Sequence, residues 1–199
     1  MAATAPQLGL RERKKLKTRV AIRRATHRLI AEQGYEATTV EQIAEAADVS
    51  PSTVFRYFPT KEDIVLSDEY DPVLVAELRA RPADEDPLDS LRTVLTRSLA
   101  TFVAEEREEF VQRTKLLAEV PAVRARMTET MATTSDLLAR ALADRLGRAH
   151  DDLNVRVFTA AVLGALREVL LYWAGRGHVD DVVGLADGAL RRMGQGWRP

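Results

Sequence analysis

The stretch ATTVEQIAEAADVSPSTVF, residues 37–55, decides the fold because it holds the start and stop signals of two short helices. Its first part offers two capping boxes, Thr38 with Glu41 or Thr39 with Gln42. In such a box the hydroxyl and the carboxyl or amide group each accept a hydrogen bond from an N–H group that the first turn leaves free. Either pair therefore starts a short helix here, and the pattern does not choose between them.

The same stretch ends this helix near Ala47 and starts another a few residues later. Ser50 is a good N-cap, since its hydroxyl can accept from the free N–H groups of the next turn. Pro51 suits the first helical position because its ring presets φ and no partner is needed there for the missing N–H. The pattern therefore predicts a third helix of the region, running to Phe58, where Pro59 stops it.

Two short helices joined by three or four residues, the second beginning with small polar side chains, are typical of a helix-turn-helix. The apolar positions are expected to pack inward and fix the angle between the helices: Val40, Ile43, Ala44, Val49, Val54 and Phe58. The outer face then presents side chains short or flat enough to approach base edges and phosphates, namely Ser52, Thr53, Arg56 and Tyr57. An ordinary helical hairpin is the alternative interpretation.

The charge distribution favours DNA binding over the plain hairpin. Up to Lys61 the chain holds eleven lysines and arginines against six acidic residues, whereas the remainder has a surplus of acidic residues. Apolar spacing predicts a first helix from Leu10 to Gln33, stopped by Gly34, and most of these basic residues lie on its outer face. Such a face attracts phosphates independently of base sequence. The alternative is a solvated basic face with no partner.

Several classes of site are excluded or disfavoured. The chain has no cysteine, which excludes disulfides and thiolate sites. His27, His150 and His178 show no helical pairing with another ligand, and no glycine-rich phosphate loop is present, so we expect no metal and no cofactor. The first ten residues lack the apolar core of a secretion signal, and no run approaches the roughly 20 apolar residues of a membrane span. We therefore expect a cytoplasmic protein without a membrane segment.

The rest of the chain reads as longer helices, because leucine, alanine, arginine and glutamate dominate it. The predicted helices cover residues 61–79, with a bend or break at Asp71–Pro72, and then 87–105, 108–117, 121–146, 151–173 and 179–193. The predicted class is all-α. A three-helix DNA-binding domain at 11–61, with its second and third helices at about 39–58, would follow a disordered arm at 1–10 and precede a helical domain at 62–199.

The segment AEQGYEATTVEQIAEAADVSPSTVFRYFPTKEDIV, residues 31–65, closely resembles the DNA-binding domain of the TetR family of bacterial transcriptional regulators. The resemblance extends over about residues 16–67. It rests on a Gly-aromatic pair, a Thr-Val start, an Ile-Ala pair, a Val-Ser turn and an aromatic-x-x-Phe-Pro-x-Lys end, all in order. It implies that Thr39, Tyr57 and Lys61 contact backbone phosphates. It also places Ser52, Thr53 and Arg56 where base contacts are usual, with Ser50 beside them in the expected DNA-binding set.

Two positions depart from the family pattern. Asp48 stands where glycine is usual in the turn, and aspartate adopts the left-handed conformation more readily than most residues, though at some cost. Phe55 stands where tyrosine is most frequent, so one phosphate hydrogen bond of the family is missing. Phe55 is expected to pack against a sugar or a thymine methyl group instead, or not to contact DNA at all.

The resemblance also implies that the second domain holds a ligand between its helices and dimerises through its last two helices. The residues agree with this, because the helix predicted at 151–173 is apolar over too wide an arc for a surface helix. Its small residues Ala161, Gly164 and Ala165 would let another helix approach closely. A four-helix contact between two subunits is therefore expected. Two reading helices would then address half-sites about one helical turn apart.

A set of apolar residues in the second domain could line a ligand cavity, with arginines to meet an anionic group. The candidates are Phe102, Phe110, Arg113, Leu117, Met127, Met131, Phe158 and Trp173, with Arg124 as a second arginine. For each of these residues, plain core or a solvated surface is the alternative. The segments at residues 68–95 and 116–127 are similar to the subgroup of the mycofactocin regulator, which implies an acyl-CoA-like ligand.

The sequence thus favours a homodimeric repressor that a hydrophobic or acyl-CoA-like molecule releases from a palindromic operator. An activator and a ligand-independent DNA-binding protein are the nearest alternatives. A helical enzyme would need titratable groups converging in one cavity. The glutamate doublets at 105–106 and 108–109 are better explained as a solvated charge run, so no catalytic residue is predicted.

Overall fold

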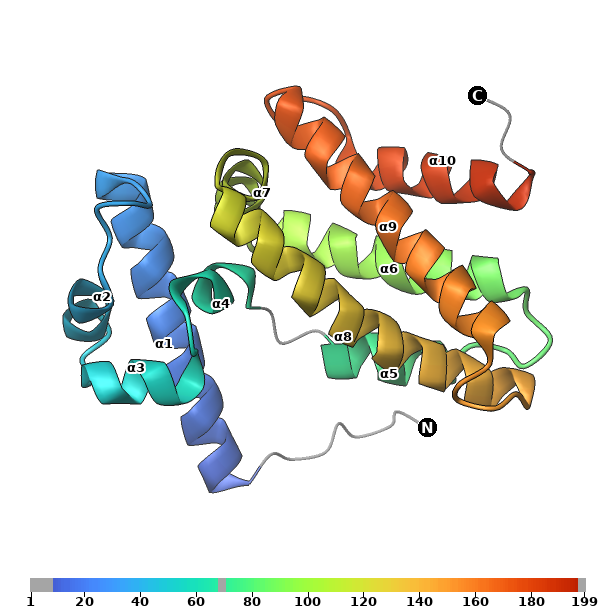
Figure 1. Cartoon of the computed structure of the whole chain (residues 1–199), viewed down its shortest axis with the longest axis horizontal. Helices are drawn as coiled ribbons and strands as arrows, with labels where there is room; N and C mark the ends of the chain where they lie inside the picture. Colours follow the sequence, from blue (N-terminus) through green and yellow to red (C-terminus); the bar gives the residue numbers. More distant parts are fainter. Residues whose placement is uncertain (1–8, 68–70, 197–199) are drawn as a thin grey trace. The chain divides into compact units, whose positions relative to one another are not determined.

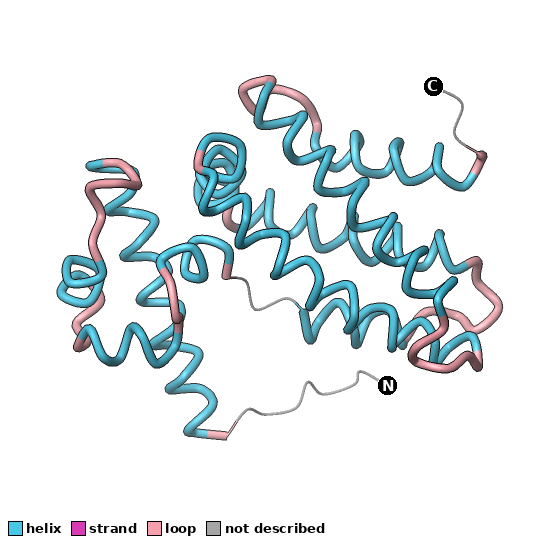
Figure 2. Tube along the Cα trace, viewed as in Figure 1, coloured by secondary structure: helices cyan, strands magenta, loops and turns pink. Residues whose placement is uncertain are grey.

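The computed structural model describes residues 9–67 and 71–196, and within these ranges it contains ten α-helices and no strand (Figures 1 and 2). The predicted all-α class is therefore confirmed. The chain divides into two compact units, residues 1–67 and 68–199.

The first unit consists of α1 (Leu10–Gln33), α2 (Val40–Ala46), α3 (Pro51–Tyr57) and α4 (Lys61–Leu66). The structure shows which of the two predicted capping boxes starts α2. Thr39 Oγ1 accepts a hydrogen bond from the Gln42 N–H at 3.3 Å, and Gln42 Oε1 accepts one from the Thr39 N–H at 2.9 Å. Thr38 is instead buried, and its hydroxyl donates to the Gly34 carbonyl at 2.8 Å. The second predicted capping box is therefore the one that forms.

Side-chain hydroxyl groups also begin α3 and α4, and the cap of α3 lies at its predicted position. Ser50 Oγ accepts from the Thr53 N–H at 3.2 Å and begins α3. Thr60 and Asp63 form a further capping box, in which Thr60 Oγ1 accepts from the Asp63 N–H at 3.1 Å and begins α4. Because each short helix has its own cap, α2, α3 and α4 have defined starts despite their small size.

The apolar faces of these helices meet in one core. Its buried members are Ile22, Ile43, Ala44, Val54, Phe58 and Ile64, and Val40 and Val49 pack against them half-buried. All six side chains predicted to face inward therefore lie in or against this core. Each large one contributes roughly 1.5–3 kcal/mol by leaving water, and together they fix the angle between α2 and α3.

The turn between α2 and α3 is strained at Asp48, whose φ is 53°. The Val49 N–H bonds to the Ala44 carbonyl at 2.9 Å and so closes the turn. An L-residue in this left-handed region costs about 1–2 kcal/mol, reduced for aspartate, whereas glycine adopts it freely. The prediction that the turn asks for glycine at this position is confirmed by the backbone.

Asp48→Gly is expected to stabilise the protein by about 0.5–1 kcal/mol, because glycine removes the left-handed strain at the turn. Urea unfolding followed by circular dichroism measures the change. Asp48→Ala is the matched control and should destabilise, since it keeps a Cβ and loses the polar side chain that favours this conformation. Equal or lower stability of the glycine variant would contradict the assigned strain.

The second unit consists of α5 (Asp71–Arg79), α6 (Pro87–Glu105), α7 (Arg107–Glu119), α8 (Pro121–Leu146), α9 (Leu153–Gly175) and α10 (Val182–Gly194). The break predicted at Asp71–Pro72 occurs earlier, since α4 ends at Leu66. Pro72 then falls in the first turn of α5, where a missing N–H costs nothing. The last two helices begin two and three residues later than predicted, because Asp152 and Asp181 act as their N-caps.

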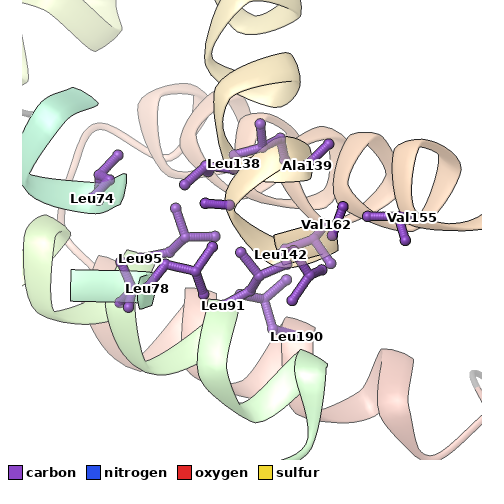
Figure 3. Packing of buried hydrophobic residues seen from close by; sticks show 14 residues of the cluster. Leu74, Leu78, Leu91, Leu95, Leu138, Ala139, Leu142, Val155, Val162 and Leu190 are labelled. Carbon is purple, nitrogen blue, oxygen red and sulfur yellow. The ribbon is translucent and has the colours of Figure 1, made fainter. Parts of the chain in front are cut away.

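Side chains from five helices form the main core of the second unit, which Figure 3 shows from close by. Leu74 and Leu78 of α5 and Leu91 and Leu95 of α6 face Leu138 and Leu142 of α8, Val155 and Val162 of α9 and Leu190 of α10. A second cluster joins α6, α7, α9 and α10 through Leu99, Phe110, Leu170, Trp173, Val182 and Ala186. The cavity described below lies against both clusters.

Helix α9 is unusually apolar. Its mean hydropathy reaches 1.5 over 18 residues, so by length and composition it alone among the described helices could cross a membrane. By itself this is weak evidence of a membrane span, because the core helix of a water-soluble protein passes the same test. Only 28% of that window is buried within the chain. Leu153, Val157 and Tyr172 are 72%, 58% and 54% exposed, so this chain alone leaves an apolar face of α9 uncovered.

Candidate nucleic-acid interface and ligand pocket

Helix α3 presents the predicted polar residues on its outer side. Ser52 and Arg56 are exposed and Thr53 and Tyr57 half-buried, while Val54 and Phe58 point into the core. Side chains three or four residues apart share a helix face. Because Val54 and Phe58 face the core, the polar side chains must lie on the outer side of the helix. The helix therefore offers one polar face to a partner. That these side chains read DNA is still a prediction.

Hydrogen bonds organise the polar groups at the start of α3. Ser50 Oγ lies 2.9 Å from Ser52 Oγ and 2.9 Å from Thr53 Oγ1, so three hydroxyl groups form one cluster. The Arg56 guanidinium carbon lies 5.3 Å from the centroid of the Tyr57 ring, within the range of a cation–π contact. The Arg56 guanidinium group is thus held beside an aromatic ring, and its N–H groups can still donate hydrogen bonds to a partner.

Lys61 is engaged within the chain. Its Nζ donates to the Tyr35 carbonyl at 2.7 Å and to the Thr38 carbonyl at 3.0 Å, and lies 3.9 Å from the Tyr35 ring centroid. An ammonium group has three protons, so one is left for a phosphate. The structure therefore gives Lys61 a structural role, which is to tie the start of α4 to the turn before α2. The sequence pattern did not indicate this role.

Tyr35 and Glu62 complete the same cluster and were also missed from the sequence. The Tyr35 hydroxyl donates to Glu62 Oε1. Burial and this hydrogen bond raise the pKa of Tyr35 above its ordinary range. Burial acts to raise the pKa of Glu62, but the hydrogen bond from Tyr35 and the nearby Lys61 charge hold it below its ordinary value. Thr39, the first predicted phosphate contact, follows directly on a turn that this cluster fixes.

Phe55, the position that the sequence could not place, is 51% exposed. Ser52 and Arg56 lie three residues before it and one after it, so all three project from the same region of the α3 surface. An exposed phenylalanine beside polar side chains leaves apolar area for a partner to cover. We expect this ring to pack on a sugar or a thymine methyl group.

Phe55→Ala is expected to weaken operator binding about 3- to 10-fold, because roughly 1 kcal/mol of apolar contact is lost. The ring is exposed in the free protein, so the midpoint of thermal unfolding should hardly change. Fluorescence anisotropy with a labelled operator measures the affinity. Phe55→Tyr keeps the ring and serves as the control. Equal affinity of the alanine variant and the parent protein would remove Phe55 from the interface.

The second unit contains a partly open cavity of about 130 Å³ among α5, α6, α7, α8 and α9. It is lined by Leu74, Leu95, Ser98, Leu99, Phe102, Phe110, Arg113, Met127, Thr130, Met131, Thr134, Leu163, Leu166, Arg167 and Leu170. Five of the predicted ligand residues lie among these, namely Phe102, Phe110, Arg113, Met127 and Met131. The lining is mainly apolar with a few polar groups, which is the usual composition of a small-molecule site.

The other predicted residues lie elsewhere. Leu117 is buried in the core, and Trp173 is fully buried behind Phe110. Phe158 lines a separate hollow that also includes Leu88 and Leu146. Arg124 is exposed, and its Nη1 donates to the Ala118 carbonyl at 3.4 Å, so it does not reach the cavity. These differences arise because residues on one apolar helix face share a hydrophobic environment, yet only some of them border an empty volume.

One wall of the cavity consists of two stacked phenylalanine rings, and a tryptophan ring packs behind them. The ring centroids of Phe102 and Phe110 lie 5.7 Å apart at 18°, and those of Phe110 and Trp173 lie 5.6 Å apart at 30°. Trp173 Nε1 donates to the Asp180 carbonyl at 2.8 Å, while the His178 ring meets the Trp173 ring edge-on. Burial and the charges of Arg107 and Lys115 lower the pKa of His178. The Trp173 ring behind the two phenylalanines is thus held in place by contacts on its far side.

Arg167 is a further residue of the cavity, half-buried on α9, and it was not among the predicted ligand residues. The polar lining residues Ser98, Thr130 and Thr134 were also missed. A signal for Arg167 was present in the sequence, because it is a charged residue within the most apolar helix of the chain. A charge in such a helix needs a partner or a functional reason.

Comparisons with known proteins agree for both units. Residues 22–67 match the model of bacterial regulatory proteins of the tetR family, and residues 85–198 match the MftR C-terminal domain. HTH-type transcriptional regulator TcmR of Streptomyces glaucescens is 34% identical over 86% of this chain and 80% of its own length. The transcriptional repressor KstR of Rhodococcus jostii is 28% identical over 79% of this chain and 68% of its length.

A solved structure is also similar over both units. It is that of FadR from Thermus thermophilus, described as a transcriptional repressor in complex with lauroyl-CoA. The two chains are 28% identical, with a TM-score of 0.58 over 91% of this chain and 95% of that one. The similarity extends over both the helix-turn-helix unit and the helical unit that contains the cavity.

Proposed function

The chain belongs to the TetR family of bacterial transcriptional regulators, and from this premise we propose that it is a homodimeric repressor which a small molecule releases from a palindromic operator. The small molecule would be hydrophobic or acyl-CoA-like. The single observation that carries the proposal is the polar outer face of α3, held by its caps and core in the geometry of a reading helix.

Support for the DNA contacts comes from the distribution of side chains on the first unit. Ser52, Thr53 and Arg56 would contact base edges, whereas Thr39, Tyr57 and the third proton of Lys61 would contact phosphates, with Ser50 holding the hydroxyl cluster. Exposed basic residues of α1 supply the attraction to phosphate that does not depend on sequence: Arg11, Arg13, Lys14, Lys15, Lys17, Arg24 and Arg28. We assign this role to residues 11–61 and the sensing role to residues 62–199.

Dimerisation through α9 and α10 is supported by the uncovered apolar face of α9. Val157, Ala161 and Gly164 recur at helical spacing along it, and the small residues would allow the partner's helix to approach closely. A second copy would cover this face symmetrically and set the distance between two reading helices. We propose that the apolar character of α9 serves this contact, and that the protein is cytoplasmic and bound to the nucleoid when it occupies its operator.

The cavity supports a role in sensing. A ligand that prefers one spacing of the two reading helices over another shifts the population toward that state. Repression would end when the preferred spacing no longer matches the operator. Relatives named as repressors, one of them in complex with lauroyl-CoA, support both the direction of regulation and the class of ligand.

Two alternatives differ in testable ways. An activator or a ligand-independent regulator would share the DNA contacts, and only the position of the operator and the response to ligand would distinguish it. An enzyme would need groups that accept and donate protons near neutral pH, whereas the charged groups lining this cavity are the guanidiniums of Arg113 and Arg167. We therefore propose that the cavity binds a ligand without transforming it.

The experiment that tests the function is an operator gel-shift assay. DNA from the promoter regions beside the gene is first searched for a bound palindrome, and the complex is then titrated with acyl-CoA thioesters and apolar acids of several chain lengths. We expect specific binding in the nanomolar range that at least one compound weakens 10-fold or more. Specific binding that no compound in either class affects would contradict the sensing half of the proposal.

A further inference from the structure

The partly open cavity of the second unit is small. Pockets for small molecules usually have volumes of about 300–1,000 Å³, whereas this cavity has about 130 Å³. An apolar cavity of about 150 Å³ in another protein binds benzene. The cavity therefore matches a single six-membered ring in size, and a fused ring system or a long alkyl chain would have to extend beyond it.

Aromatic side chains border this volume. Phe102 and Phe110 both line it, and their ring planes are only 18° apart. The Trp173 ring packs on Phe110 with the two centroids 5.6 Å apart, which helps to hold Phe110 at the border of the cavity. Aromatic rings gain energy from offset-stacked or edge-to-face contacts with one another, beyond the gain from apolar burial alone. An aromatic ring in the cavity would extend this stack, whereas a saturated ring of the same size would lack the gain.

One hydroxyl group of the cavity lining has no hydrogen bond. Ser98 is half-buried on α6, and within the described part of the chain its hydroxyl has no hydrogen-bond partner. The hydroxyl of Thr130, by contrast, donates to the Arg126 carbonyl at 3.2 Å. A hydroxyl that is partly removed from water and unpaired is unfavourable, and a polar group on a ligand would satisfy it.

The unpaired hydroxyl and the aromatic wall lie close together. Ser98 and Phe102 are four residues apart on α6, so their side chains share one face of that helix. A ring that packs against Phe102 can therefore carry a polar substituent to Ser98. Arg113 lies on the same wall, with its guanidinium carbon 5.8 Å from the Phe102 ring centroid. Guanidinium groups attract the faces of electron-rich rings, so this wall favours an aromatic ring that bears a hydroxyl group.

The two arginines of the lining do not require an anionic ligand. Arg113 already lies beside the Phe102 ring. Arg167 also lines the open groove between α8 and α9, where water can reach its guanidinium group. The Ser98 hydroxyl is therefore the polar group of the lining for which a ligand is the partner.

We propose that the effector is a compact phenol, a single aromatic ring with one hydroxyl group. Its ring packs against Phe102 and Phe110, and its hydroxyl forms a hydrogen bond with Ser98. Met131 of α8 also lines the cavity and limits the size of the ring system that fits. This inference rests on the proposed sensing function and chooses, within it, a compact ring over a long chain.

The first test compares p-cresol, toluene and 4-methylcyclohexanol, which are nearly equal in size, by isothermal titration calorimetry with the full chain. Toluene lacks the hydroxyl group, and 4-methylcyclohexanol lacks the aromatic ring. We expect p-cresol to bind about 3- to 10-fold more tightly than either compound, through one hydrogen bond in the first comparison and one aromatic contact in the second. Equal affinities overturn the inference. Tighter binding of 4-methylbenzoate than of p-cresol also overturns it, because an arginine would then make the polar contact.

The second test removes the hydroxyl from the protein. Ser98→Ala should abolish the preference for p-cresol over toluene and leave the affinity for toluene unchanged. Thr96→Ala is the matched control, since Thr96 is also half-buried on α6, but its hydroxyl donates to the Arg92 carbonyl at 2.7 Å and lies outside the cavity lining. This control should keep the preference. A preference that persists in Ser98→Ala excludes Ser98 as the partner of the ligand and overturns the inference.

The third test enlarges the cavity. Met131→Ala removes a long side chain from the lining and should shift the affinity ratio toward 2-naphthol over p-cresol by at least about 5-fold. General destabilisation would weaken both compounds and leave their ratio unchanged, so the ratio reports the cavity itself. Circular dichroism checks that the variant is folded. An unchanged ratio in a folded variant places the ligand outside this cavity and overturns the inference.

Operator release separates this inference from the proposed function. p-Cresol is added to the compounds titrated against the operator complex, and we expect it to weaken operator binding about 10-fold or more at saturation. Release by acyl-CoA thioesters and not by p-cresol overturns the inference and leaves the sensing function standing. Operator binding that no compound weakens, p-cresol included, contradicts the sensing function itself.

Discussion

Ala161→Arg is expected to convert the dimer into monomers and to weaken operator binding more than about 100-fold, because a buried, unpaired charge costs several kcal/mol. Ala161 is exposed in the free chain and lies between Val157 and Gly164 on the uncovered face of α9. A long charged side chain in the middle of that face would be both too large for close helix packing and unpaired once covered. A monomer holds only one reading helix, so it loses the gain from binding two half-sites together.

Size-exclusion chromatography with light scattering measures the oligomeric state of this variant, and fluorescence anisotropy measures its operator affinity. Ala125→Arg is the matched control, since Ala125 is also exposed in a long helix but lies on α8, away from the apolar face of α9. Circular dichroism should show both variants folded. A dimeric Ala161→Arg protein with unchanged operator affinity would exclude α9 from the dimer contact.

Local signals in the sequence predicted most of the helices because caps and prolines act within a few residues. The hydroxyl groups of Thr39, Ser50 and Thr60 each begin a short helix by accepting a hydrogen bond from the backbone N–H three positions ahead. The starts of α9 and α10 were predicted two to three residues early, because apolar spacing alone does not show that Asp152 and Asp181 are the N-caps. Periodicity shows that a helix exists, and the cap decides where it begins.

The candidate functional residues also fall into two groups, those that local sequence signals predict and those that only the packing of the chain identifies. The outer face of α3 follows from helical spacing alone once its inward residues are known. The contacts of Lys61 could not be predicted, since they join positions more than 20 residues apart in the chain. The residues that line the cavity could not be predicted from the sequence either. Phe110 borders the empty volume, whereas Trp173, which is equally apolar, lies behind it. Only packing separates a lining residue from a core residue.

Arg56→Ala is expected to weaken binding to the specific operator more than about 30-fold and to relax base preference at one position of each half-site, since a bidentate arginine contact to guanine contributes about 1–3 kcal/mol of discrimination and is lost at both half-sites. The side chain is exposed and projects from the middle of α3, with its guanidinium beside the Tyr57 ring. In a dimer the loss occurs twice, once at each half-site, so the effect on the operator exceeds that of one contact.

The measurement for Arg56 is a comparison across a set of operators with each base pair substituted in turn. Arg24→Ala is the matched control, because Arg24 is exposed on the basic helix α1 and is expected to contact phosphate only. That variant should weaken all operators by a similar factor and lower the salt dependence of binding, while base preferences stay as in the parent protein. Arg56→Ala should do the reverse, with a changed pattern of preferences. If both variants weaken every operator equally, Arg56 contacts the backbone and base readout falls to Ser52 and Thr53.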